Sequence, residues 1–268
     1  MSGFPELSRI DWPRPWLAPL LPVALPLLET DDWRSALNFA AAESDLRNHR
    51  GLPLRFVEQA ELPVGTAYEA FISETGRVPT RSNLHDFFNA LMWLRFPCIK
   101  AGLNRLQSAE ITRAETHPAA VGKRGKLRDG ATIFDENAAL FITSDPAVAG
   151  SLREHRWEDL FISQRKQFGV HVDVVLFGHA LIEKLVVPYK AITGHAWIIP
   201  VEPEFFLAST AEQRLWVDRI VANQIDGGLS TFDFNPLPIL GVPGWWQGQD
   251  LDYYRDVDVF RPKRAAPS

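Results

Sequence analysis

The sequence predicts a helix-rich α+β fold, with a small mixed sheet and irregular Pro-rich N- and C-terminal segments around a single domain. Its 268 residues are 46% hydrophobic and 23% charged, as in an ordinary globular domain. Segments with apolar residues every three or four positions outnumber segments rich in β-branched residues, so helices should outnumber strands. The strands are too few for a barrel or a doubly wound sheet.

We expect residues 1–268 to form one domain with three parts, because no repeat, linker or change in composition divides the chain. Residues 1–30 are proline-rich and are expected to lie as an irregular segment on the core. Residues 31–231 carry the helical and strand patterns of the α+β core. Residues 232–268 begin with FDFNPLPILGVPGWW and are expected to wrap around that core.

Helices are expected where apolar residues recur at helical spacing between a capping residue and a breaker. The strongest signal starts at Asn83, where NLHDFFNALMWLRF predicts a mostly buried helix that ends at Pro97. The other expected helices cover 32–47, 66–74, about 98–115, 146–155, 157–167, 179–186 and 211–225.

The expected strands are short runs rich in β-branched or aromatic residues. Two of them flank Asp135-Glu-Asn-Ala, and β-prone runs around an Asp/Asn turn predict a hairpin over 131–143. The Gly-rich basic stretch VGKRGKLRDG before it is expected to be a loop. The expected strands cover 54–57, 131–134, 139–143, 170–177 and 195–201.

The charge balance argues against one broad class of function. The chain has 28 Lys and Arg against 33 Asp and Glu, and its net charge of −5 disfavours general binding to the nucleic-acid backbone. The one cysteine, Cys98, excludes a disulfide framework, favours a cytoplasmic location and is expected to be buried. The apolar stretch 16–28 is too short to span a bilayer, so no membrane segment is expected.

Histidines inside apolar segments are the first candidates for a functional site. His85 and Asp86 begin the predicted buried helix, and both could bind a metal ion or transfer a proton. His179 and Glu183 are four residues apart in a predicted helix and therefore share a face. The candidate metal ligands are His85, His179, Glu183 and His195. A buried hydrogen bond would also explain His85 and the His179–Glu183 pair, and a favourable charge in a first helical turn would explain Asp86.

Charged residues near the expected hairpin form a second group. Asp129 and Asp135, with the neighbouring Glu136, could hold a divalent cation or supply an acid/base pair, although Asp135-Glu-Asn-Ala is also ordinary turn chemistry. The basic loop could bind an anion, but it lacks the phosphate-loop signature, so a solvated loop is the default interpretation. Its cations are Lys123, Arg124, Lys126 and Arg128.

Four segments, in order along most of the chain, resemble a bacterial and mainly proteobacterial family of unknown function, DUF3025. They are NLHDFFNALMWLRFPCIKAGLN, RDGATIFDENAAL, FGHALIEKL with the following PYK, and PLPILGVPGWW. The resemblance implies that the whole chain is one unit, and it implies no particular activity.

The candidate residues support two hypotheses. The first is a cytoplasmic metal-assisted hydrolase acting on a small anionic substrate, in which a divalent metal ion activates water, a carboxylate acts as general base and the basic loop orients the substrate. Its site would combine His85, Asp86, His179 and Glu183 with Asp129 or Asp135. One ion can bind both histidines only if they lie within about 12 Å.

The alternative is a non-catalytic protein that binds a ligand or a partner, with the same histidines and acids forming a structural network. A nucleic-acid contact through residues 123–128 and the basic C-terminal residues is disfavoured by the overall charge.

Overall fold

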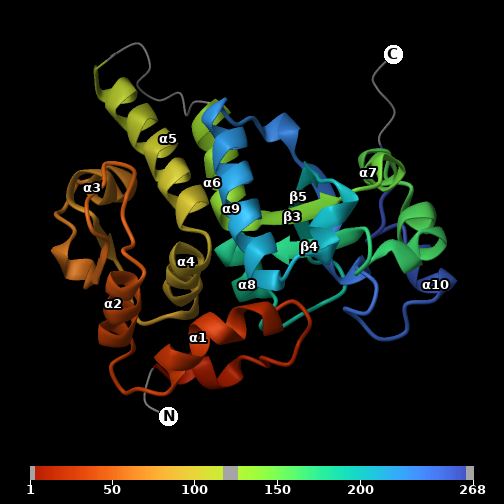
Figure 1. Cartoon of the computed structure of the whole chain (residues 1–268), viewed down its shortest axis with the longest axis horizontal. Coiled ribbons are helices and arrows are strands. Elements are labelled where there is room, and N and C mark those ends of the chain that lie inside the picture. The colour runs from red at the N-terminus through yellow and green to blue at the C-terminus, as the bar shows by residue number, and fades with distance from the viewer. Residues whose placement is uncertain (1–3, 117–125, 264–268) are drawn as a thin grey trace.

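The computed structural model describes residues 4–116 and 126–263 of the chain and has the expected α+β class (Figure 1). Its helices are α1 Leu21–Leu28, α2 Trp33–Glu43, α3 Tyr68–Thr75, α4 Leu84–Arg95, α5 Pro97–Thr116, α6 Lys126–Asn137, α7 Pro146–Arg153, α8 His179–Lys184, α9 Thr210–Asp226 and α10 Leu251–Tyr254. Its strands are β1 Arg55–Val57, β2 Arg77–Pro79, β3 Ala138–Thr143, β4 Val172–Leu176, β5 Thr193–Pro200 and β6 Asn235–Pro238.

The main sheet is small and mixed, as expected. Its strand order is β4-β3-β5-β6, with β3 and β5 parallel and both outer pairs antiparallel. Successive side chains of a strand point to opposite faces, and every residue of β3 is buried, so both faces are covered there. α6 packs against β3 and β5, and α7 packs against β3 and β6. The short strands β1 and β2 form a separate parallel pair.

Helix α4 is the buried helix expected from the sequence, and it packs against α8 and α5. The side chain of Asn83 caps its first turn by accepting a hydrogen bond from the backbone N–H of Asp86 at 2.8 Å. α5 begins at Pro97, where Asp218 of α9 accepts hydrogen bonds from the backbone N–H groups of Cys98 and Ile99 at 3.0 and 2.9 Å. These caps fix the two ends of the segment that carries His85.

The expected hairpin over 131–143 is wrong. Residues 131–134 belong to α6, whose Leu127, Ala131 and Phe134 recur at intervals of four and three residues and pack towards the core. The ring of Phe134 packs against those of Phe177 and Trp197, at centroid distances of 5.2 and 5.4 Å. β3 pairs with β4 and β5 instead, because the tertiary packing of Phe134 outweighs the β-propensity of a four-residue run.

Other expectations also change in the structure. The basic stretch is helical from Lys126 onward, while Lys123 and Arg124 lie outside the described residues. α1 forms inside the segment expected to be irregular, with Pro22 in its first turn, where a missing N–H costs nothing. Residues 159–163 form a π-helical turn within the expected helix 157–167.

Two further residues or segments differ from or add to the expectation. Cys98, which was expected to be buried, is exposed. Within the segment 232–268, expected to wrap around the core, residues Asn235–Pro238 form the edge strand β6.

No helix of the described residues is long and apolar enough to cross a lipid bilayer.

The turn from β4 into α8 depends on the absence of a side chain at Gly178. The backbone N–H of Gly178 donates to the carbonyl oxygen of Ala138 at 2.8 Å. A Cβ atom at this position would lie 2.5 Å from backbone atoms of Asn137 and Ala138. The turn therefore brings His179, the first residue of α8, directly beside the end of α6.

We predict that Gly178→Ala lowers the free energy of unfolding by about 3 kcal/mol or more, because the new methyl group meets backbone that cannot move aside. Gly150→Ala inside α7 is the control, since its Cβ would have no neighbour closer than Arg156 Nη2 at 3.9 Å. That variant should gain up to about 1 kcal/mol. Urea denaturation measures both, and equal stabilities would contradict the proposed role of Gly178.

Candidate metal centre

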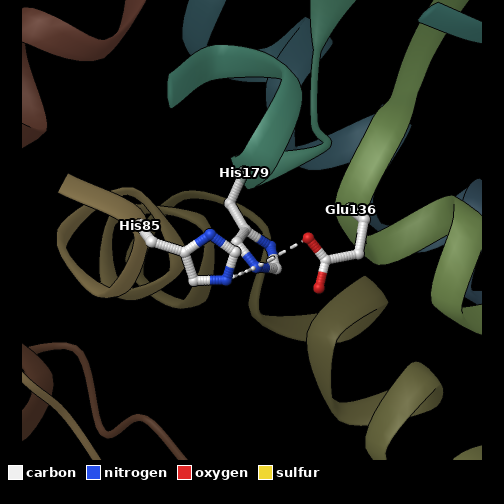
Figure 2. Close-up of side chains that lie close together, drawn as sticks. All are labelled: His85, Glu136 and His179. Carbon is white, nitrogen blue, oxygen red and sulfur yellow. Dashed lines mark hydrogen bonds and ion pairs between the residues drawn. The ribbon is translucent and has the colours of Figure 1, made fainter. Parts of the chain in front are cut away.

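Three helices place three metal-ligating side chains together (Figure 2). His85 comes from the first turn of α4, Glu136 from the last turn of α6 and His179 from the start of α8. The Nε2 atoms of the two histidines are 3.1 Å apart, and His179 Nε2 is 3.5 Å from Glu136 Oε2. One ligand atom from each residue lies within 4.8 Å of the other two.

These separations match those of ligands around one metal ion. Ligand atoms about 2.1 Å from a tetrahedral ion lie about 3.4 Å from each other. Burial lowers the pKa of His179 to about 4, so its ring is neutral at physiological pH and keeps a lone pair for a metal. Without an ion, the Nε2–H of one ring has to donate a hydrogen bond to Nε2 of the other ring. A bound ion would instead be coordinated by the Nε2 lone pairs of both rings.

Glu183 orients His85 from the other side of the ring. Its Oε2 atom is 3.0 Å from His85 Nδ1, and it lies one helical turn after His179 on α8. A carboxylate on the second nitrogen of a metal-binding histidine fixes the tautomer and raises the basicity of the ligating nitrogen. This contact directs His85 Nε2 towards His179 and Glu136.

A buried ion pair between Lys100 and Asp135 lies beside His179. Lys100 Nζ lies 2.6 Å from Asp135 Oδ1 and 2.8 Å from Asn89 Oδ1, and Asp135 Oδ1 is 3.9 Å from His179 Nδ1. Burial would raise the pKa of the Asp135 carboxyl, but the charge and the hydrogen bond of Lys100 hold it below its usual value. Asp135 is therefore charged, and it connects α5, α6 and α8 below the three ligands.

His85, Glu136 and His179 line an open pocket of about 330 Å³. Polar groups also face this pocket from α3 and from the segment before α4. Glu69 is held by Asn104, whose Nδ2 donates to its Oε2 at 2.7 Å, and burial raises the pKa of the Glu69 carboxyl. Arg81 lines the pocket as well, so its positive charge and the Glu69 carboxyl both adjoin the candidate metal position. The remaining lining residues include Tyr68, Asn89, Gln107 and Thr132.

The structure brings together some of the predicted site residues and separates others. His85 and His179 meet, far inside the 12 Å limit, and Glu183 and Asp135 lie beside them. Asp86 lines the pocket but pairs with Arg81, accepting hydrogen bonds from Nε at 3.0 Å and Nη2 at 2.9 Å.

Other predicted residues lie outside this cluster. His195 is on β5 with its ring 6.0 Å from that of Phe234, and it is not among the described residues of the cluster. Asp129 is in the first turn of α6 and does not line the pocket of the described residues. Lys126 and Arg128 are in the first turn of the same helix and Glu136 is in its last turn, although the charge of Arg128 acts on Glu69 at the pocket.

The sequence patterns do not point to Lys100, Tyr68 or Glu69. They assign Glu136 to the acids of an expected hairpin turn, whereas in the structure it lies on a helix and faces His179. The signal was the helical spacing of Leu127, Ala131 and Phe134, which puts Glu136 at the end of α6.

The model of a protein family described as "Protein of unknown function (DUF3025)" matches residues 54–264, most of the chain. Searches of the curated proteins and of the solved structures found no match.

We predict that Lys100→Met lowers the free energy of unfolding by about 3–5 kcal/mol, because it leaves the charge of Asp135 buried without a partner. Adding Asp135→Asn removes that charge and should recover a large part of the loss. Lys263→Met, which breaks an ion pair whose side chains are both half exposed, should cost less than about 1 kcal/mol. Urea denaturation of the four proteins tests this, and a Lys100→Met loss as small as that of Lys263→Met would contradict it.

We also predict that His179 makes the metal-free protein sensitive to acid. Its pKa of about 4 in the folded chain is below the value near 6.5 of an unfolded histidine. Protonation below pH 6.5 therefore favours the unfolded chain, and the contribution of neutral His179 is lost progressively down to about pH 4, by about 3 kcal/mol in total.

The measurement is the free energy of unfolding in a chelator between pH 4 and 7.5, for the wild type and His179→Gln. The wild-type advantage should be largest above pH 6.5 and shrink as the pH falls. An advantage that stays constant over this range would show that His179 does not titrate as described.

Proposed function

Because the chain belongs to the DUF3025 family, whose description assigns no activity, we propose its function from the site alone: a metal-assisted hydrolase acting on a small anionic substrate. The observation that carries this proposal is the convergence of His85, His179 and Glu136 at an open pocket. Two histidines and one glutamate are a known ligand set of catalytic zinc, which keeps one position for water. The ion would lower the pKa of that water and supply a hydroxide nucleophile.

The residues around this position have chemistry suited to hydrolysis. Glu69 lines the same pocket and, with its raised pKa, is suited to accept a proton from water and pass it to a leaving group. Arg81 is the cation that we assign to an anionic substrate group, since its charge lies at the pocket while Asp86 holds its orientation. The expected anion-binding role of Lys123, Arg124, Lys126 and Arg128 stays a prediction.

The main alternative is a ligand- or partner-binding protein in which these residues form only a structural network. The direct hydrogen bonds of His85 to Glu183 and His179 favour this alternative, because the rings have partners without an ion. The two proposals differ in what the ligands do. A structural network predicts that replacing a ligand lowers stability, whereas a metal centre predicts that it removes the binding of an ion.

We predict that the purified, chelator-treated protein binds one Zn²⁺ per chain in isothermal titration calorimetry. His179→Gln and Glu136→Gln each remove one ligand and should weaken binding by at least about 100-fold, and Glu183→Gln should weaken it by about 10- to 100-fold through the lost orientation of His85. His171→Gln is the control, since His171 contacts Ser144 outside the cluster. Unchanged Zn²⁺ binding in both ligand variants would overturn the metal centre.

Turnover is tested on the same proteins with p-nitrophenyl phosphate and p-nitrophenyl acetate. Glu69→Gln should keep the metal and lower kcat by about 100-fold or more, as expected for a lost proton acceptor. Glu74→Gln on the exposed face of the same helix should leave kcat unchanged. A protein that binds Zn²⁺ and shows no metal-dependent turnover of either ester would support the ligand-binding alternative.

A further inference from the structure

A second pocket lies at the opposite end of α4 from the metal ligands. Arg95 and Phe96 line it at the C-terminal end of this helix, whereas His85 lies at its N-terminal end. Ten residues of helix separate Arg95 from His85, a distance of about 15 Å along the axis. The second pocket has a volume of about 150 Å³ and shares no lining residue with the first.

Arg95 brings a buried charge to this pocket. Its residue surface is only 7% exposed, and its Nη1 atom donates to the backbone oxygen of Pro19. Its Nε atom is fully buried and has no hydrogen-bond partner among the described residues. Within the described part of the chain, the carboxylate that acts on Arg95 electrostatically is that of Asp173, and it forms no direct ion pair with Arg95. Burying this charge is unfavourable, and burial lowers the pKa of the guanidinium to about 10, although the charge of Asp173 acts in the opposite direction.

Arg214 adds a second positive charge. Its Nη1 donates to the backbone oxygen of Arg95 at 3.1 Å, and its side chain lines the same pocket from α9. The two like charges lower the affinity of Arg95 for its proton, and such a pair favours an anion between or beside the two groups. Asp173 also lines the pocket, from the exposed side of β4, but forms no ion pair with either arginine. The lining charges therefore sum to a net positive charge.

The remaining walls are largely apolar. Phe96, Phe205 and Trp245 line the pocket together with aliphatic side chains. Inorganic phosphate or sulfate would leave these walls in contact with a strongly hydrated ion. A carboxylate joined to a short hydrocarbon body satisfies both parts of the surface.

We propose that this pocket binds a small organic carboxylate, with its carboxyl group at Arg95 and Arg214 and its apolar body against Phe96, Phe205 and Trp245. The guanidinium fork matches the geometry of a carboxylate. The volume equals that of about five water molecules in the liquid, which suits an acid with a few carbon atoms. This site is independent of the metal centre.

The ligand can be a simple carboxylic acid or an α-amino acid. The charge of Asp173 should distinguish these two classes of ligand. The ammonium group of an amino acid would pair with Asp173, whereas a simple acid would be repelled by it. Asp173→Asn should therefore weaken the binding of valine and strengthen that of isovalerate.

The test is a calorimetric titration of the chelator-treated protein with isovalerate, valine, isobutylamine and inorganic phosphate, with Trp fluorescence as a second signal. We expect at least one of the two carboxylates to bind saturably, and isobutylamine and phosphate not to bind. Arg214→Met should weaken carboxylate binding at least tenfold, because it removes a charge-assisted hydrogen bond. Arg219→Met, an exposed substitution on the same helix, is the matched control and should bind normally.

Arg95→Met provides a second variant whose folding is expected to survive, since replacing a buried charge with an apolar side chain of similar length is often neutral. The carboxylate should raise the Tm of the wild type and of His179→Gln, and leave that of Arg95→Met unchanged. Absence of carboxylate binding, preferential binding of phosphate, or normal binding by Arg214→Met would each overturn the proposal.

Discussion

The contact between Gly178 and the junction of α6 and β3 is the constraint on which the site depends. The strand β4 and the helix α8 meet at this glycine, and the backbone hydrogen bond to Ala138 leaves no room for a Cβ atom. Because α6 ends at the same point, Glu136 and His179 are brought face to face although 43 residues separate them along the chain. α4 packs on α8 and completes the group with His85.

Electrostatic balance then explains why so many polar residues lie inside an apolar core. Lys100 offsets the charge of Asp135, and Asn89 takes a further hydrogen bond from the same ammonium group and donates one to Tyr68. Glu183 satisfies the outer nitrogen of His85. Two nitrogens of the histidines and the Glu136 carboxylate are left facing one another, which is the arrangement that a cation would stabilise. At the other end of α4, the Nε atom of Arg95 has no hydrogen-bond partner among the described residues.

Much of this fold could be predicted from local patterns, and the site only in part. The buried helix α4 follows from apolar spacing and the Asn83 cap, and the helical neighbours His179 and Glu183 follow from their four-residue separation. The local sequence of residues 131–134 does not show whether they form a helix or a strand. The helix is stabilised by the packing of Phe134 on Phe177 and Trp197, which are far away in the sequence. With that helix missed, neither the position of Glu136 nor the burial of Lys100 beside Asp135 could be inferred.

X-ray absorption spectroscopy of the Zn²⁺-loaded protein shows directly whether His85, His179 and Glu136 bind one metal ion together. We expect two imidazole nitrogens and at least one oxygen at about 2.0–2.2 Å from the ion. His179→Gln should reduce the imidazole signal to one ring. A spectrum without imidazole scattering, or one that His179→Gln leaves unchanged, would show that these residues do not hold the ion.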